Sequence, residues 1–177
     1  MKERKLLFQN PVTLLFLGAA PALAASVDVR AAIGMSIAVM AVLRLLPEGA
    51  EPVAAEIPGL TSCVVNAWTA ETEEGSLYVF HMLPYGYANE VMDLYLVLDE
   101  SGAITALRTK ELILHSEYFS DYTLDEASYK EGLMGLTADS YTGEQTLIAG
   151  ATMSSDAMES AVRAAFEAFW LLTENRG

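Results

Sequence analysis

Apolar residues are distributed in two different ways along this chain. Between residues 6 and 46 they are almost continuous, and the only ionisable side chains there belong to Asp28, Arg30 and Arg44. From Pro47 onward, apolar residues come in short runs separated by polar or glycine-containing turns. About 20 apolar residues are enough to span a bilayer, whereas short runs bounded by turns are typical of a folded domain. The pattern therefore predicts an N-terminal transmembrane helical segment followed by a globular domain.

Four runs in the globular part predict β-strands. They read SCVVNAWTA, SLYVFHMLPY, EVMDLYLVLDE and AITALRTKELIL, and they are separated by turn-forming residues. Their content of Val, Leu, Tyr and Ile favours an antiparallel β-meander. The clearest turn is DESG, from Asp99 to Gly102, because Gly102 can adopt a positive φ at no steric cost.

Two helices are predicted after the strands. The first covers residues 124–136, begins at Thr123 or Asp125 and ends around Gly135. The second runs from about Ser155 to Thr173. Its apolar positions recur at intervals of three and four residues and are Met158, Ala161, Val162, Ala165, Phe169 and Leu172. Strands followed by helices indicate an α+β fold in which the C-terminal helices pack on the sheet.

The expected domain organisation is a membrane anchor at 1–46, a linker at 47–59 and a folded domain at 60–177. The linker contains PEGAEPVAAEIP, in which Pro, Gly, Ala and Glu show no periodic apolar face. Three interpretations of the anchor are open: a short hairpin, a kinked or re-entrant segment before one crossing, and a cleaved signal peptide. The third is suggested by PALAAS, which contains a small-residue cleavage pattern.

Basic residues near the start give an expected orientation in a bacterial cell membrane. Lys2, Arg4 and Lys5 precede the apolar segment, and the positive-inside rule places them in the cytoplasm. One net crossing would make the globular domain extracytoplasmic, whereas a hairpin would keep it inside. We expect the extracytoplasmic arrangement.

The globular part is strongly acidic. It holds 22 of the 24 acidic residues but only five of the ten basic ones, which argues against binding to nucleic acid or to an anionic lipid surface. The single cysteine, Cys63, allows no intrachain disulfide and no cysteine cage for a metal. His81 and His115 lack partners at a recognised ligand spacing, so no metal site is expected. No hydrolase, zinc-protease or P-loop motif is present, and no catalytic acid or base is expected.

One short stretch carries the candidate chemistry. In AGATMSSDAM, the residues Ser154, Ser155 and Asp156 are favoured N-cap residues, so the last helix is expected to begin close to Thr152. A helix N-terminus attracts phosphate through unpaired N–H groups and the helix dipole. Gly150 and Ala151 would leave room for a large group beside the Thr152 hydroxyl. An ordinary capped turn is the alternative interpretation of the same pattern.

The stretch AGATMSSDAMESAV resembles the S-G-A-T-x-[ST]-S-x-A-V signature of a known domain. The known domain with that signature is the FMN-binding domain of the Rnf complex G subunit and of the C subunit of the sodium-translocating NADH:quinone reductase. The likeness covers about residues 60–172. It implies FMN bound covalently to Thr152 through a phosphoester, attached by a flavin transferase. The implied cofactor-binding residues are Thr152, Gly150, Ala151, Ser154, Ser155, Glu117 and Tyr87.

The same likeness has departures at three positions. Thr146 stands where the family usually has Asp, and Ala149 stands where it usually has Ser. Glu117 is followed by Tyr118, where family members tend to have Glu-Thr with nearby glycines. The departures at Thr146 and Ala149 concern the attachment of the flavin. The departure after Glu117 concerns the contacts with the flavin ring.

The apolar N-terminal segment resembles a second type of subunit. FQNPVTLLFLGAAPALAASVDVRAAIGMSIAVMAVL is similar to the N-terminus of the D/E-type membrane subunits of the same complexes. Ala20 stands where that family has a cysteine that ligates an intramembrane iron-sulfur cluster, and a methyl group cannot bind iron. The resemblance therefore implies a segment that retains the sequence pattern and has lost the cluster.

The two resemblances imply an electron-transfer subunit of a membrane redox complex of the Rnf or quinone-reductase type. Its cofactor would be FMN on Thr152, and its partners would be the other subunits, the membrane and the flavin transferase. Two alternatives are a degenerate, non-flavinylated domain that acts as a membrane-anchored binding or assembly module, and a secreted flavoprotein released from a signal peptide.

Overall fold

The computed structural model describes residues 38–57, 63–109 and 130–174 of the 177-residue chain. The chain divides into two compact units, Met1–Arg44 and Leu45–Gly177. In the first unit, residues 38–43 are helical, and the rest of the predicted anchor up to residue 37 lies outside the described residues. Among the residues described, no helix is both long and apolar enough to cross a membrane.

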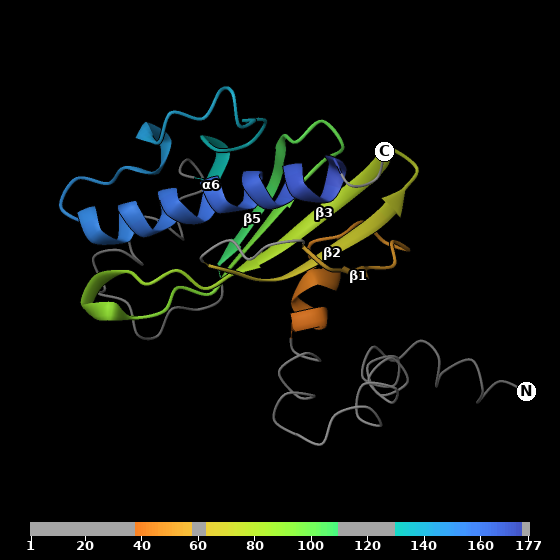
Figure 1. Cartoon of the computed structure of the whole chain (residues 1–177), viewed down its shortest axis with the longest axis horizontal. Helices are drawn as coiled ribbons and strands as arrows, with labels where there is room; N and C mark the ends of the chain where they lie inside the picture. Colours follow the sequence, from red (N-terminus) through yellow and green to blue (C-terminus); the bar gives the residue numbers. More distant parts are fainter. Residues whose placement is uncertain (1–37, 58–62, 110–129, 175–177) are drawn as a thin grey trace, which may run out of the picture. The chain divides into compact units, whose positions relative to one another are not determined.

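The second unit is built on a five-stranded antiparallel sheet whose strands follow one another in chain order (Figure 1). The strands are β1 (Val53–Ala55), β2 (Val64–Thr72), β3 (Gly75–Met82), β4 (Leu94–Leu98) and β5 (Ile104–Thr109). The four predicted strands correspond to β2 to β5, so the prediction of an antiparallel meander is confirmed.

The structure differs from the prediction at β1, which lies inside the segment expected to be a linker. Val53 pairs with Thr69 and Ala55 with Ala67, so β1 forms one edge of the sheet. A strand of three residues is too short to show an alternating pattern in the sequence. Its position depends on the hydrogen bonds that β2 offers.

The turn between β4 and β5 has the conformation that its sequence predicts. Gly102 has a φ of +79°. The carboxylate oxygen Oδ1 of Asp99 accepts hydrogen bonds from the backbone N–H of Ser101 at 2.9 Å, from the Ser101 hydroxyl at 2.6 Å and from the N–H of Ala103 at 3.0 Å. This network closes the turn and fixes the register of the two strands that it joins.

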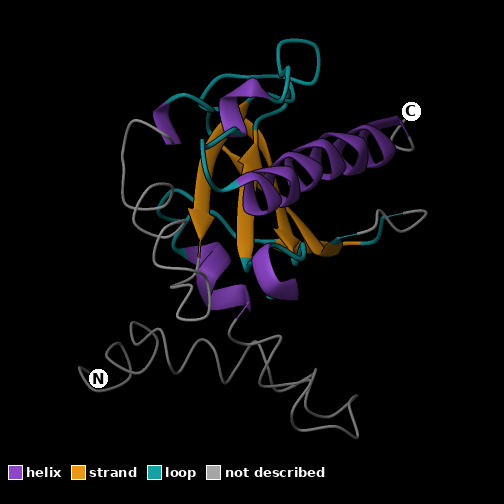
Figure 2. Cartoon of the chain, turned by 90° about the vertical axis from the view of Figure 1, so that its left-hand side faces the viewer, coloured by secondary structure: helices purple, strands orange, loops and turns teal. Residues whose placement is uncertain are grey.

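A long helix, α6 (Thr152–Glu174), lies across one face of the sheet (Figures 1 and 2). Its apolar stripe is buried as predicted: Met158, Ala161, Val162 and Ala165 are inaccessible, and Phe169 and Leu172 pack against the same core. The helix begins at Thr152, in agreement with the start expected from the cap residues and three residues before the expected run from about Ser155. The alanines of the stripe are small, which allows the helix to approach the sheet closely.

The first predicted helix is described only at its end. Residues 130–131 are helical and are followed by turns up to Gly135, whose φ is +77°; the expected start at Thr123 or Asp125 lies outside the described residues. Two backbone hydrogen bonds attach this segment to β5, from Gly135 N to the Ile104 oxygen at 2.8 Å and from Ile104 N to the Leu136 oxygen at 2.9 Å.

Two glycines with almost the same φ allow the contact between the β4–β5 turn and α6 to be tested. A Cβ at Gly102 would lie 2.9 Å from Cε1 of Phe169, whereas a Cβ at Gly135 would have no atom within 4 Å. We expect Gly135→Ala to lower the free energy of unfolding by about 1 kcal/mol through backbone strain alone. Gly102→Ala should cost at least about 1 kcal/mol more because of the clash.

Urea unfolding of the purified chain measures both values. In the double variant Gly102→Ala with Phe169→Ala, the extra cost at Gly102 should largely disappear, because the clashing ring is gone. Equal costs at the two glycines would show that Phe169 does not constrain the turn.

The Asp99 turn should be sensitive to pH. Burial acts to raise the pKa of Asp99, but hydrogen bonds from the Ser101 side chain and from the N–H groups of Ala103 and Ser101 favour the carboxylate and hold the pKa below its usual value. Because the folded-state pKa is depressed, the stabilisation is present above the unfolded-state pKa of about 3.9. It is lost as pH falls through the lower folded-state pKa.

Asp99→Asn should therefore destabilise the chain at pH 7 and have little effect at about pH 2, measured by urea unfolding at the two values. Asp139→Asn, at an exposed position in another turn, is the control and should leave the profile unchanged. An Asp99→Asn effect that is the same at both pH values would contradict the role assigned to the carboxylate.

Candidate functional site

The start of α6 exposes the residue that the sequence analysis singled out. The backbone oxygen of Ala151 accepts the first helical hydrogen bond, from Ser155 N at 2.9 Å. Thr152 and Met153 follow on the exposed side of the first turn, and Gly150, with a φ of +87°, is exposed just before it. The first-turn N–H groups of an α-helix have no partner within the helix. The first turn of α6 contains no acidic residue.

The two serines of the first turn hold neighbouring loops against the helix. Ser154 and Ser155 are each only 2% exposed. The Ser155 hydroxyl oxygen accepts a hydrogen bond from the N–H of Ile148 at 2.9 Å, and the Ser154 hydroxyl oxygen accepts a long one from the N–H of Tyr87 at 3.4 Å. Both were expected near the helix cap and the phosphate; the structure places their side chains inward, where they fix the loops on either side.

A second connection reaches α6 through Gly86. The loop between β3 and β4 folds back on itself, with a β-bridge between Tyr85 and Val91 and a hydrogen bond from Gly86 N to the Glu90 oxygen at 2.8 Å. A Cβ at Gly86 would lie 3.0 Å from Sδ of Met92 and 3.3 Å from the Ser154 hydroxyl oxygen. The glycine therefore lets this loop, with Tyr87, approach the start of the helix.

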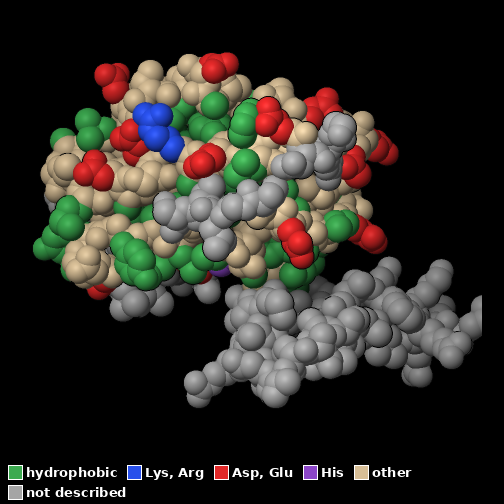
Figure 3. Space-filling model, viewed as in Figure 1, with side chains coloured by type: hydrophobic (Ala, Val, Ile, Leu, Met, Phe, Trp, Pro, Cys, Tyr) green, Lys and Arg blue, Asp and Glu red, His purple; other side chains and the backbone are tan. Residues whose placement is uncertain are grey.

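Four large apolar side chains on these connected segments are more than half exposed. Tyr85 is 70% exposed, Tyr87 54%, Leu147 62% and Met153 54%. We call these four residues the apolar end. Figure 1 places the loop that contains η1 (Tyr87–Asn89) at the end of the domain where α6 begins. In Figure 3 hydrophobic side chains gather at that end, whereas acidic ones are spread over the visible face.

The segment before Gly150 is anchored by a buried hydroxyl. Thr146, at the end of η2 (Glu144–Thr146), is 1% exposed. Its hydroxyl donates to the Gly143 oxygen at 2.9 Å and lies 2.9 Å from the Tyr141 hydroxyl. Burial raises the pKa of Tyr141, and the hydrogen bond with Thr146 acts in the opposite direction. Thr146 therefore has a structural role in this segment.

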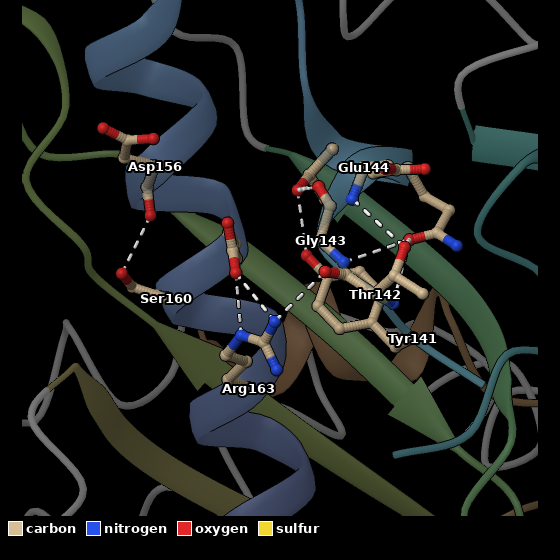
Figure 4. Close-up of polar contacts among 10 residues, drawn as sticks. Tyr141, Thr142, Gly143, Glu144, Asp156, Ser160 and Arg163 are labelled. Atoms are coloured by element: carbon tan, nitrogen blue, oxygen red, sulfur yellow. Dashed lines mark hydrogen bonds and ion pairs between the residues drawn. The ribbon is translucent and has the colours of Figure 1, made fainter. Parts of the chain in front are cut away.

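The same segment is tied to the middle of α6 (Figure 4). Arg163 donates to Glu159 at 2.8 Å and to the backbone oxygen of Thr142 at 3.3 Å, and its guanidinium lies 5.3 Å from the centre of the Tyr141 ring. A Cβ at Gly143 would lie 2.6 Å from Oε1 of Glu159. These contacts leave the loop that leads to Thr152 little freedom.

Most of the predicted cofactor-binding residues come together at this end of the domain. Thr152, Gly150, Ala151, Ser154 and Ser155 are consecutive or nearly so. Tyr87, 65 positions earlier in the chain, joins them through its hydrogen bond with Ser154. Glu117 lies outside the described residues. The exposure of Leu147 and Met153 was not predicted; the available signal was Met153, an apolar residue between Thr152 and Ser154.

A separate polar cluster lies on β3 and its neighbours. His81 Nε2 is 2.8 Å from Oδ1 of Asp93, the Asn66 amide nitrogen is 3.2 Å from His81 Nδ1, and the imidazole stacks on Tyr95 at 4.4 Å. Burial and the nearby Asp93 raise the pKa of Tyr95 to about 12. Within the part of the chain that the structure describes, no group of three or more His, Cys, Asp or Glu residues could hold a metal.

Cys63, the single cysteine of the chain, is a free thiol. The side chain is buried in the main core, and burial raises the pKa of the thiol. A buried thiol with a raised pKa is a poor nucleophile.

Comparison with known proteins bears on the N-terminal unit. Residues 3–50 match a family model described as Rnf-Nqr subunit, membrane protein. The N-terminal segment is similar to an Rnf-Nqr membrane subunit. This supports the prediction of a membrane-associated subunit of a multi-subunit redox complex. No curated protein and no solved structure matches the chain. The Rnf-Nqr match ends before β1, so it does not extend to the predicted FMN-binding domain.

The role of Ser155 as an anchor can be tested against a second serine of the same helix. Ser155→Ala would leave the Ile148 N–H without its acceptor, and we expect a loss of about 1–2 kcal/mol in the free energy of unfolding. Ser160 is exposed, and its hydroxyl donates to the Asp156 oxygen one turn earlier (Figure 4). Ser160→Ala should change stability by less than about 0.5 kcal/mol. Similar effects of the two changes in urea unfolding would contradict the anchoring role.

Proposed function

We propose that this chain is an electron-transfer subunit of a membrane redox complex of the Rnf or quinone-reductase type and carries FMN as a phosphoester on Thr152. The observation that carries the proposal is the exposed position of Thr152 in the first turn of α6. A hydroxyl buried in the core could not be reached by a flavin or by the enzyme that attaches it.

The surroundings of Thr152 suit a phosphate. The N–H groups and the dipole of a helix N-terminus favour an anion, and α6 is 23 residues long with no acidic residue in its first turn. Gly150 has no side chain and Ala151 has only a methyl group, so a bulky group can lie close to the backbone. Ser154 and Ser155 position this turn by holding the loops on either side.

The surroundings also suit an aromatic ring system. Tyr87 and Met153 are exposed next to the first turn, and aromatic and thioether side chains make favourable contacts with flat aromatic groups. The flavin would supply the redox chemistry. The residues of this chain would bind it, orient it and set its exposure to water, with no acid or base required.

A second function is favoured by a specific observation. Thr146 takes part in a buried hydrogen-bond pair with Tyr141, so the position where an acidic residue is usual in the FMN-binding family has a structural role here. A non-flavinylated domain that acts as a membrane-anchored binding or assembly module is therefore the alternative. The flavin transferase is a proposed partner only in the first case.

The proposed location follows from the similarity of the N-terminal segment. That segment resembles a membrane subunit, and its first basic residues, Lys2, Arg4 and Lys5, favour a cytoplasmic start. We propose that the acidic domain lies on the extracytoplasmic side.

Covalent attachment can be tested by changing the hydroxyl without changing the shape of the side chain. Thr152→Val should abolish the FMN adduct and Thr152→Ser should retain part of it when each is produced together with a flavin transferase. Thr105→Val removes an exposed threonine hydroxyl from β5 and should leave the adduct at the wild-type level. In-gel fluorescence under denaturing conditions and intact mass measure the result.

The two proposed functions give different results in that experiment. Wild-type protein without any FMN adduct would refute covalent attachment and favour the assembly module, especially if the purified chain is colourless and takes up no added FMN. An adduct that persists in Thr152→Val would show that the flavin is attached elsewhere.

A further inference from the structure

The apolar end is held in a fixed shape by contacts between segments far apart in the sequence. Tyr87 is attached to Ser154 through its N–H, and Leu147 is followed by Ile148, whose N–H is held by Ser155. The four exposed side chains therefore belong to a fixed surface and not to independent loops. Tyrosine and methionine are enriched in the centres of protein interfaces, and exposed apolar clusters mark binding sites.

Backbone strain in the loop that carries Tyr85 and Tyr87 supports the same conclusion. Ala88 and Asn89 both have left-handed backbone conformations, with φ values of +57° and +60°. Asparagine tolerates this region, whereas alanine is disfavoured there by roughly 1–2 kcal/mol. Such strain persists only where the surrounding contacts impose it, and it is concentrated at functional surfaces.

The two segments that carry the apolar end contain only acidic charges, and Arg163, which contacts Thr142 just before the second segment, is paired with Glu159. Residues 83–93 and 144–158, which supply the four apolar side chains, contain Glu90, Asp93, Glu144 and Asp156 and no Lys or Arg. Glu144 and Asp156 are exposed. A partner that covers the apolar centre must therefore face carboxylates around it, which favours complementary basic groups.

We propose that the apolar end is a docking surface for a partner protein whose own surface has an apolar centre and a rim of Lys and Arg side chains. The inference rests on the proposed function in one respect, since the docked partner would lie beside Thr152. Four exposed side chains suit a small interface, below roughly 1,200 Å² in total, of the kind found in transient redox encounters.

Two other occupants fit the charges less well. Anionic lipid headgroups would be repelled by the carboxylates, and no Lys or Arg in these two segments could bind a lipid phosphate. A second copy of the chain would bring two acidic rims together, which is unfavourable for like charges in an interface.

The test uses the full chain in native membranes with a photo-crosslinking residue, p-benzoylphenylalanine, in place of Tyr85. Irradiation should give a crosslink to a peptide rich in Lys and Arg from one co-purifying protein. Because charges are screened within about 3 Å at 1 M salt, against about 10 Å at 0.1 M, the yield should fall about fivefold over that range. Leu147→Ser in the same chain should lower the yield about fivefold as well, since an apolar contact is lost.

The matched control places the same residue at Trp170, which is 55% exposed on α6. It lies 17 residues after Met153, about 25 Å along the helix, and should not give that product. A homodimer, a lipid adduct, a crosslinked peptide without basic residues, an equal yield from position 170 or no product would each overturn the proposal.

The docking proposal and the proposed function can fail separately. The crosslink should still form in Thr152→Val, because the docking surface does not include that hydroxyl. Loss of the crosslink in a chain that still carries FMN would overturn docking alone, whereas a wild-type chain that crosslinks as expected but never carries FMN would overturn the flavin proposal alone.

Discussion

The packing of α6 on the sheet is the interaction on which the rest of the domain depends. Its stripe of small residues, among them Ala161 and Ala165, brings the helix close to the strands and forms the main core. Loop segments before and beside the helix are then held against its surface. The first turn, with Thr152, is presented on a rigid element and not on a free loop, which would suit the proposed attachment of a large group.

Three glycines make the close contacts around α6 possible. Gly86 approaches Ser154, Gly102 approaches Phe169, and Gly143 approaches Glu159; in each case a Cβ would lie 3.3 Å or less from the helix side chain. The loops are thereby fixed at the beginning, middle and end of the helix. Side-chain hydrogen bonds, such as those of Ser155 and Arg163, add to this arrangement.

The two parts of the chain differ in polarity. The N-terminal segment, similar to a membrane subunit, is apolar, whereas the domain that follows is acidic. An acidic surface is repelled by anionic lipid.

The sequence by itself determined the strands β2 to β5, the Asp99–Gly102 turn and the buried stripe of α6, because each depends on local patterning: alternation, a turn glycine, or a helical repeat. Tertiary structure alone decided that β1 is a strand, that Ser154 and Ser155 face inward, and that Tyr87 meets them. These features depend on hydrogen bonds and close packing between residues distant in the chain, and such contacts leave no periodic signal in a single sequence.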